Sequence, residues 1–540
     1  MGIQGFFAWL RQLTPAAFSK SRLGPRGRGF DHVLVDCNHL IHRAAAATHK
    51  KEKVLQILSG LLWKNFQSAT TPAKSVFFAV DGPGPLAKMI EQRRRRVDSH
   101  AKILKKEGKA MFHPGNLTPG CHFMNRVDDF LVLFASRAFA VKKWKKPLSV
   151  TVSGSRVPGE GELKLIQEAK HLMLKRSNDS YAFITSDADI VALALASSLP
   201  AQIYNTFSHD FFDVQTLASH LSALFPTCPP NRIARDFALL TMFSGGDSIP
   251  KMRHVSMSGL WATYRLFKRK HPDLYLTVDS DRAGIHIGAL FKYCQAGLDA
   301  QTLMAQHQHG LVHEDASMSQ TRIEEWLKCM AWVLDGGLRG VHLDYSVLYE
   351  GELAPSPLQI VKMCSATSSS EGDQVVYASD STVPPLCPEM CAAALLPSGL
   401  QPFIPYAFGD IMSQVNFELK SAGNDQAATI KVLRSLQSRT LPQVVKPAKL
   451  ICVSHNRLDI PEPLRLTVPL VPGFTPNRDT SRYTAFHLER GIVDYSDWYQ
   501  MNNFVPPVRK KREPFDRSKW DNDQEDALLD KRKVKIASSL

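Results

Sequence analysis

The 540-residue sequence lacks a long apolar run and any CxxC pair of cysteines. No apolar segment approaches the ~18 residues that a membrane-spanning helix needs, which predicts a soluble protein without a membrane partner. The nine cysteines are scattered and odd in number, so we expect reduced thiols in an intracellular compartment rather than a disulfide framework. With 44% hydrophobic and 22% charged residues, the composition is that of an ordinary globular protein.

Acidic residues are missing from the first 29 positions, which contain five basic ones. Such a segment superficially suits a mitochondrial presequence. Residues 1–15 have no serine, however, and they contain a bulky aromatic cluster that is better suited to packing. Across the whole chain, 66 Lys and Arg face 51 Asp and Glu, a net charge of +15. This surplus suits a polyanion bound through its phosphates, and a merely soluble basic surface is the alternative.

The order of patterns along the chain predicts an α/β fold. From residue 31 to residue 250, strand-like runs alternate with helical patterns, as a doubly wound parallel sheet requires. Later segments have helical spacing, and Ala366–Pro385 is rich in serine and proline, which indicates an insertion loop. We divide the chain into a core (1–250), a helical continuation and linker (251–320), a second, largely helical region (321–440), an unassigned segment (441–504) and a basic, disordered tail (505–540).

Carboxylates follow the ends of four predicted strands, and a fifth apolar run also ends in one. In an open parallel sheet the ligand crevice lies outside the carboxyl ends of the strands, so these side chains should converge. Like charges this close cannot all stay ionised without cations, and oxygen ligands suit hard divalent metals. A single Asp after a strand is most often a helix cap or turn residue, but four coinciding strand ends favour a metal site. The candidate ligands are Asp36, Asp81, Glu160, Glu162, Asp187, Asp189 and Asp247.

A strongly basic helical pattern follows Asp81 directly. Between Lys88 and Lys109 nine Lys or Arg face three acidic residues. Such charge runs are usually solvated faces, but the position beside a candidate metal ligand favours a phosphate site, to which arginine donates paired bonds. The residues that share one helical face are Lys88, Gln92, Arg95 and Arg96.

These motifs together resemble the eukaryotic 5′→3′ exoribonuclease family. The resemblance is strong over residues 1–250, traceable in pieces to about residue 440, and not traceable beyond. The motifs that carry it are, in order, MGIQGFFAWL, LVDCNHLIH, FFAVDGPGPLAKMIEQRRRR, NLTPGCHFM, VSGSRVPGEGELK, ITSDADIVALAL and DFALLTMFSGGDSIP.

The resemblance implies a flap-endonuclease/PIN-like nuclease core that binds two Mg²⁺ ions, for which Mn²⁺ can substitute. All seven acidic positions of the family match the candidate ligands above. The family's 5′-monophosphate pocket matches Lys88, Gln92, Arg95 and Arg96, and its base-stacking histidine matches His42. The implied activity is release of mononucleotides from the 5′ end of monophosphorylated single-stranded RNA, in RNA decay or RNA processing.

Three stretches depart from the family pattern. Leu163 replaces a histidine, and Gly245–Ser248 reads Gly-Gly-Asp-Ser in place of Gly-Asn-Asp-Phe, which predicts weaker support for the last ligand. In residues 341–355, Tyr345 or Val347 stands where the family has the tryptophan that sandwiches the terminal base with His42. We therefore expect a weaker grip on each new 5′ end and frequent dissociation between cleavages.

Two alternatives stay open. One is a catalytically weak, RNA-binding scaffold subunit of a ribonucleoprotein, and the other is a structure-specific DNA endonuclease on the same core. Apart from these alternatives, a protein partner in an RNA-processing complex is a further expectation. The basic clusters Arg509–Arg512 and Lys531–Lys535 resemble nuclear localisation signals, although such tails also bind RNA. We expect a nuclear protein, with the cytoplasm as the alternative and the mitochondrion as the less favoured one.

Overall fold

The computed structural model divides the chain into two compact units, 1–498 and 499–540. The predicted basic tail lies outside the described residues. The described residues all belong to the first unit and are 5–20, 29–69, 72–105, 112–140, 149–175, 178–308, 318–366, 374–423, 425–439, 448–454 and 488–494.

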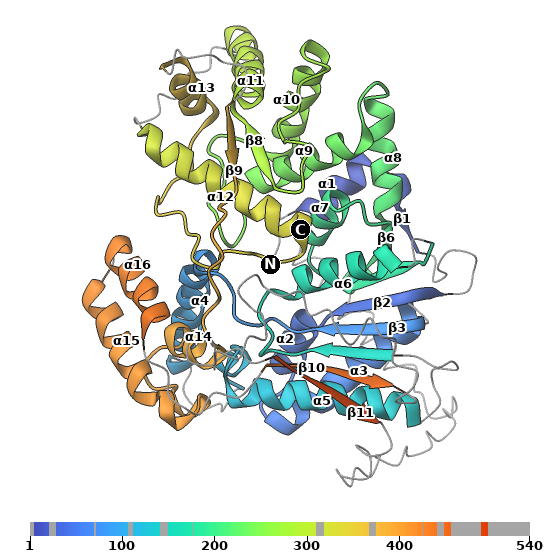
Figure 1. The fold of residues 1–540 in the computed structure, drawn as a ribbon, viewed down its shortest axis with the longest axis vertical. Coiled ribbons are helices and arrows are strands. Elements are labelled where there is room, and N and C mark those ends of the chain that lie inside the picture. Colours follow the sequence, from blue (N-terminus) through green and yellow to red (C-terminus); the bar gives the residue numbers. More distant parts are fainter. Residues whose placement is uncertain are drawn as a thin grey trace, which may run out of the picture. The chain divides into compact units, whose positions relative to one another are not determined.

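A nine-stranded sheet lies at the centre of this described part (Figure 1). Strands β2 to β6 run parallel, whereas β7 and β1 add antiparallel strands at one edge and β10 pairs antiparallel with β4 at the other. The spatial order is β1-β7-β6-β5-β2-β3-β4-β10-β11. The strands are β1 (Phe18–Ser19), β2 (Phe30–Asp36), β3 (Pro72–Ala79), β4 (Ser149–Ser153), β5 (Tyr181–Thr185), β6 (Ala201–Asn205), β7 (Asp210–Asp213), β10 (Ala448–Ser454) and β11 (Leu488–Asp494).

Helices cover both faces of the sheet, which explains why its strands are apolar almost throughout. On one face Val33 and Val35 pack with α2 (Asn38–Ala46), α3 (Lys51–Ala69) and α5 (His122–Ala140). On the other, Leu34 packs with α1 (Phe6–Leu13), α6 (Gly161–Lys175), α7 (Asp189–Ala196), α8 (Val214–Leu224) and α9 (Pro230–Phe243). The predicted α/β fold with a parallel core sheet is therefore confirmed.

The N-terminal aromatic cluster packs, as its composition predicted. Phe6 and Leu10 of α1 are buried in the core on the α9 side of the sheet. The ring of Trp9 stacks on that of Phe237 with 5.9 Å between centroids. The described part of this segment is thus integral to the core.

The region after residue 250 is largely helical, as predicted. Helix α12 (Gln320–Arg339) is one of the segments with helical spacing, and its Ile323, Trp326 and Met330 are buried. Ser319 caps its start and Gly340, at φ +76°, ends it. The other elements are α10 (Met257–Lys270), β8 (Gly284–His286), α11 (Ile287–Gln308), α13 (Pro357–Ala366), β9 (Val375–Tyr377), α14 (Pro388–Leu395), α15 (Gly409–Ala422) and α16 (Gln426–Ser435).

Two segments contain more structure than the sequence patterns predicted. Part of the predicted insertion loop 366–385 is strand β9, which pairs antiparallel with β8. The unassigned segment 441–504 contributes β10 and β11 to the main sheet. All three strands pair with partners remote in sequence, which a local pattern does not reveal.

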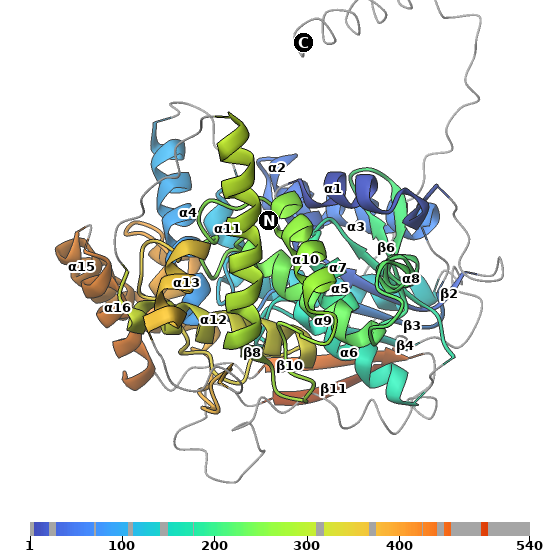
Figure 2. The same cartoon turned by 90° about the horizontal axis from the view of Figure 1, so that it is seen from above.

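The basic helix α4 (Leu86–Leu104) is fixed against the second region (Figures 1 and 2). Arg93 donates to the carbonyl oxygen of Ala394 at 2.7 Å and to Oδ1 of Asn416 at 2.9 Å. At the start of the helix, the Leu86 N–H donates to the carbonyl oxygen of Tyr345 at 2.9 Å. The face of α4 that carries the predicted phosphate site is thus held in one orientation.

Candidate active site

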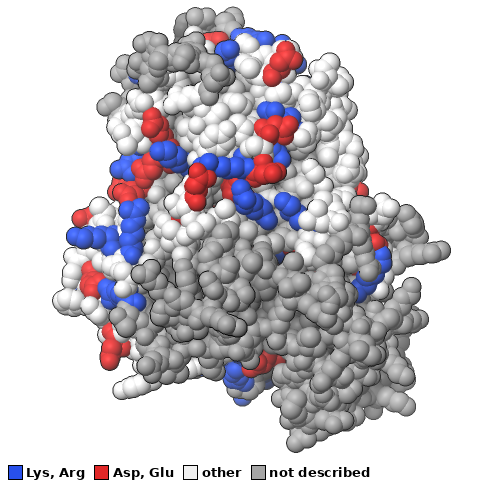
Figure 3. Space-filling model, in the orientation of Figure 1, with Lys and Arg blue, Asp and Glu red and all other residues white. Residues whose placement is uncertain are grey.

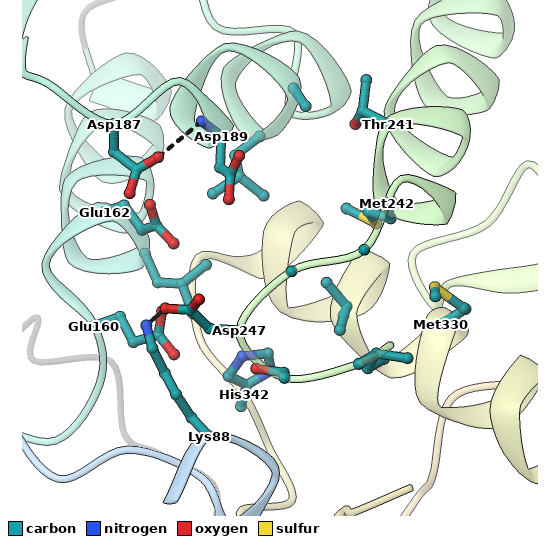
Figure 4. Close-up of a pocket in the computed structure, with 18 residues that line it drawn as sticks. Lys88, Glu160, Glu162, Asp187, Asp189, Thr241, Met242, Asp247, Met330 and His342 are labelled. Carbon is teal, nitrogen blue, oxygen red and sulfur yellow. Dashed lines mark hydrogen bonds and ion pairs between the residues drawn. The ribbon is translucent and has the colours of Figure 1, made fainter. Parts of the chain in front are cut away.

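A pocket at the carboxyl edge of the sheet gathers five of the seven predicted ligands. Figure 4 shows four carboxylates along one side of the pocket, with the Lys88 side chain reaching toward Glu160 and Asp247. Two of the four come from the start of α6 and two from the β5–α7 junction, whereas Asp247 follows α9. The five carboxylates that line the pocket are Glu160, Glu162, Asp187, Asp189 and Asp247.

Asp36 and Asp81 lie beside this pocket and are joined by Asn38. The side-chain amide of Asn38 donates to Asp36 Oδ1 at 3.0 Å, and its oxygen accepts from the Asp81 N–H at 2.9 Å. Asp81 in turn accepts from the N–H of Gly161 at 2.7 Å, which ties it to the start of α6. We call the seven carboxylates together the carboxylate cluster.

Mutual repulsion and burial disfavour the ionised forms of some carboxylates in the cluster. Burial and the neighbouring charges of Asp81 and Asp187 raise the pKa of Asp36 to about 7. Burial, with Asp187, Glu160 and Asp189 nearby, raises the pKa of Glu162 well above its usual value. A cation bound among these groups would restore their ionised forms.

The donor atoms of the cluster are those that divalent cations prefer, but the described side chains are not arranged around an ion. Its donors are carboxylate oxygens, the ligands that Mg²⁺ and Mn²⁺ prefer. Within the described ranges, however, no three acidic, histidine or cysteine side chains stand close enough together to hold one ion. Metal binding would therefore require side-chain rearrangement in the cluster.

Two cations of α4 occupy carboxylates of the cluster. Lys88 Nζ lies 2.6 Å from Glu160 Oε2, and both side chains are largely buried. Arg95 donates two bonds to Asp247, at 2.7 and 3.1 Å, and a third to Glu91. Although burial alone would raise it, the pKa of Asp247 is lowered by Arg95 and Lys88. The predicted phosphate ligands thus act as counterions here.

The remaining residues of the predicted phosphate pocket lie on the same helix. Arg96 donates to Thr118 Oγ1 at 3.0 Å, and Gln92 is half-buried. His42, on α2, is exposed, and its nearest charges are those of Arg96 and Asp81. His42 is thus near a cation of the basic helix and a carboxylate of the cluster.

The site depends on supporting residues that the sequence patterns did not single out. Thr185 Oγ1 donates to Asp36 Oδ2 at 3.1 Å and accepts from the Asp187 N–H at 3.0 Å, so it links two ligands. Lys164 is buried and donates to the carbonyl oxygens of Val80 and Gly154, at 2.6 and 3.2 Å, beyond β3 and β4. Both residues lie within the matched motifs, and only their contacts reveal their roles.

The Gly-Gly-Asp-Ser departure does not leave Asp247 without support. Gly245 adopts φ +85°, and a side chain there would collide with Lys251, so glycine suits this turn. Asp247 accepts two hydrogen bonds from Arg95, at 2.7 and 3.1 Å. The support predicted to be weaker thus comes from α4.

Tyr345, one of the two residues predicted to stand in place of the family's tryptophan, is buried. Its side chain is only 1% exposed, so neither ring face is available to a nucleotide base. Its hydroxyl has no hydrogen-bond partner among the described residues. Of the two positions predicted to replace the family's tryptophan, burial excludes Tyr345 as a stacking partner for His42, and the other, Val347, has no aromatic ring. The weaker grip on the terminal base stays a prediction.

A histidine that the sequence patterns missed also lines the pocket. His342 is buried, and its ring stacks on Trp332 with 3.9 Å between centroids. A side chain at Gly336 would collide with this ring, so the bare backbone of α12 makes room for it. Leu163, which replaces the family's histidine, lines the same pocket.

The N-terminal part of the chain, which contains six of the seven carboxylates of the cluster, matches a known protein family. Residues 1–203 match the family described as "XRN 5'-3' exonuclease N-terminus". The family predicted from the motifs is confirmed for this region.

Curated proteins named 5'-3' exoribonuclease 1 and 5'-3' exoribonuclease 2 are similar to part of the chain. "5'-3' exoribonuclease 1" of Schizosaccharomyces pombe is 26% identical over 322 residues, which is 50% of this chain and 24% of that protein. The human protein of that name is 28% identical over 220 residues, 36% of this chain and 13% of its own length. "5'-3' exoribonuclease 2" of Gallus gallus is 25% identical over 248 residues, which is 37% of this chain and 26% of that protein. The matched part thus spans about a quarter or less of these relatives.

Solved structures show a fainter resemblance. The catalytic core of Rad2 in complex with DNA is 14% identical at a TM-score of 0.33, covering 69% of this chain and 95% of that one. The bacteriophage T5 D15 flap endonuclease with DNA and metal ions is 12% identical at a TM-score of 0.27, covering 63% and 93%. A similarity at these TM-scores carries no argument about substrate or mechanism.

Proposed function

We propose that this protein is a 5′→3′ exoribonuclease that releases mononucleotides from 5′-monophosphorylated single-stranded RNA. The observation that carries the proposal is the meeting of the carboxylate cluster with the basic face of α4. Lys88 and Arg95 already bond Glu160 and Asp247 across the interface between the two. A phosphodiester held there would have acidic metal-ligand chemistry on one side and phosphate-binding groups on the other.

The residues of the site have distinct tasks in this proposal. The carboxylate cluster would hold two Mg²⁺ ions, which when bound supply an activated water and stabilise the leaving 3′ oxygen. Asn38 and Thr185 orient Asp36 within the cluster. Lys88 and Arg95 neutralise their carboxylates in the ion-free site and can transfer their bonds to a 5′ phosphate. Gln92 and Arg96 complete the phosphate pocket, and His42 stacks on the first base.

The direct test is a nuclease assay on RNA labelled at either end. The purified protein should release mononucleotides from the 5′ end in Mg²⁺ or Mn²⁺ and none in EDTA. RNA with a 5′ hydroxyl, a cap or a triphosphate should be a poor substrate, because the α4 pocket is built for a monophosphate. Release from the 3′ end, or equal cleavage of phosphate and hydroxyl ends, would contradict the proposal.

One observation favours a second candidate, the catalytically weak RNA-binding scaffold. The ion pairs Lys88–Glu160 and Arg95–Asp247 neutralise part of the cluster without any metal. If these pairs persist when RNA binds, the protein would hold a 5′ end without cutting it. Tight binding of 5′-phosphorylated RNA with no release of nucleotides in Mg²⁺ or Mn²⁺ would support this candidate.

The proposed location is the nucleus, on the basis of the basic clusters at Arg509–Arg512 and Lys531–Lys535. Imaging of the protein with and without Val508–Leu540 tests this, and an unchanged distribution would contradict it. A protein partner in an RNA-processing complex belongs to the same proposal. Among the described helices, none is long and apolar enough to cross a membrane.

A further inference from the structure

An exposed aromatic ring stands on a rigid turn beside the carboxylate cluster. Phe207, in the turn between β6 and β7, is 65% exposed. The turn is ordered by the Asn205 side chain, whose oxygen accepts from the N–H groups of Phe207 at 2.8 Å and Ser208 at 3.1 Å. The turn that exposes the ring is thus stabilised by hydrogen bonds between a side chain and the backbone.

A cation and a second aromatic ring lie next to Phe207. The guanidinium carbon of Arg43 lies 5.7 Å from the centre of its ring. The ring of His39 lies 6.3 Å away at an interplanar angle of 54°. His39 is itself anchored to the turn by a 2.7 Å hydrogen bond to Thr206. The turn and the first part of α2 therefore form one surface, which we call the Phe207 platform (Phe207, His39 and Arg43).

The Phe207 platform is bonded to the proposed catalytic machinery. The Thr206 N–H donates to the carbonyl oxygen of Thr185 at 3.2 Å, and the Thr185 side chain contacts Asp36 and Asp187. On α2, His42 precedes Arg43 and faces Asp81 and Arg96. The platform is therefore linked to the carboxylate cluster through Thr206 and Thr185, on the side of the cluster away from α4.

The order of strands gives this placement a direction. The sheet runs β6-β5-β2-β3, and α4 follows β3. The carboxylates after β2 and β5 thus lie between the α4 phosphate pocket and the turn after β6. Figures 1 and 2 both show α2 between α4 and β6. An RNA strand with its 5′ phosphate on α4 and its first phosphodiester at the cluster would continue toward Phe207.

We propose that the Phe207 platform is a binding subsite for the nucleotides that follow the scissile bond in single-stranded RNA. A base stacks on the Phe207 ring, and Arg43 binds an adjacent phosphate. Stacking on an exposed aromatic ring next to a cation is how single strands are held without sequence preference. The proposal rests on the proposed function, because it takes its direction from the 5′-phosphate pocket.

Charge also favours RNA over a protein partner on this platform. The guanidinium of Arg43 lies on this platform, and Lys20 Nζ donates to the carbonyl oxygen of Ser208 in the turn. A protein-docking site built on one aromatic residue would more often be surrounded by further apolar side chains. On the face of the molecule drawn in Figure 3, Lys and Arg are mixed with Asp and Glu across the middle.

The test compares long and short ligands in EDTA, where no cleavage occurs. The probes are a 5′-phosphorylated ten-nucleotide oligouridylate and uridine 5′-monophosphate, which fills only the 5′ pocket. Phe207→Ala should weaken the decamer about 10-fold or more and leave the monophosphate unchanged. Phe207→Trp should bind the decamer at least as tightly as the unmutated protein. The matched control is Phe417→Ala, since Phe417 is 72% exposed on the remote helix α15.

Each outcome decides between the subsite and its rivals. Unchanged decamer binding by Phe207→Ala overturns the proposal, and so does an equal loss for decamer and monophosphate, which would indicate damage to the 5′ pocket. A selective loss in a protein that releases no nucleotides in Mg²⁺ would keep the subsite and overturn the exonuclease. Full activity with no effect of Phe207→Ala would keep the exonuclease and overturn the subsite.

Discussion

The carboxylate cluster and the segment 341–355 are held in place by different kinds of contact. Six of the seven carboxylates follow parallel strands β2 to β5, whose carboxyl ends must meet at one edge. Tyr345 is placed instead by remote partners, because its N–H donates to Val383 and its carbonyl oxygen accepts from Leu86. Topology thus fixes the cluster, whereas packing of distant segments fixes Tyr345. The first can survive much sequence change, and the second cannot.

Removing a carboxylate of the cluster should have the largest effect on activity of all the changes considered. Asp187→Ala or Glu162→Ala should lower nucleotide release by more than the ~10–100-fold that changes to groups supporting a metal ligand cost. Binding of 5′-phosphorylated RNA should stay largely intact, because these ligands serve chemistry rather than affinity. Single-turnover cleavage and filter binding on the same preparations measure both. Equal loss of binding and cleavage would contradict this division.

Removing a supporting residue should have an intermediate effect. Thr185→Val keeps the size of the side chain but leaves Asp36 and Asp187 without the hydroxyl that links them. We expect activity to fall about 10–100-fold, as for other groups that orient metal ligands. Thr185→Ser is the matched control and should retain most activity. If both variants lose activity equally, packing rather than the hydroxyl is responsible.

The basic face should affect end preference more than rate. Arg96→Ala should narrow the preference for 5′-phosphate over 5′-hydroxyl RNA. Of these two substrates, only the first has the phosphate to which Arg96 would donate hydrogen bonds. The two substrates compared at low concentration give this ratio directly. Arg94→Ala is the control, since Arg94 is on the same helix but its partners are Glu91 and Asp98. A ratio unchanged by Arg96→Ala would remove Arg96 from the pocket.

The smallest expected effect concerns the buried tyrosine. Because Tyr345 is not available to a base, Tyr345→Trp should not increase processivity and should destabilise the protein by about 1–3 kcal/mol through overpacking. Intermediate-length products after addition of competitor RNA should appear with and without the substitution, since no aromatic partner for His42 is supplied at this position. Fully processive decay by the unmutated protein would mean that another ring completes the sandwich.

The sequence predicted those parts of the site that topology determines. The strand-end carboxylates and the helical face of α4 could be read from periodicity and spacing. The pairing of Arg95 with Asp247 could not, because it joins residues 152 positions apart. His342 was missed for the same reason, since only the packing of α12 brings it to the pocket. Strands β10 and β11 likewise depend on pairing with a remote partner and leave a weak local signal.

The most direct measurement is a count of bound Mn²⁺ by electron paramagnetic resonance, in the unmutated protein and in Asp187→Ala. It does not depend on activity. If the carboxylate cluster is a two-metal site whose side chains rearrange on binding, the unmutated protein should bind two Mn²⁺ ions and Asp187→Ala fewer. Absence of bound Mn²⁺ in the unmutated protein, with or without 5′-phosphorylated RNA, would contradict this and favour the scaffold held by its own Lys88 and Arg95 ion pairs.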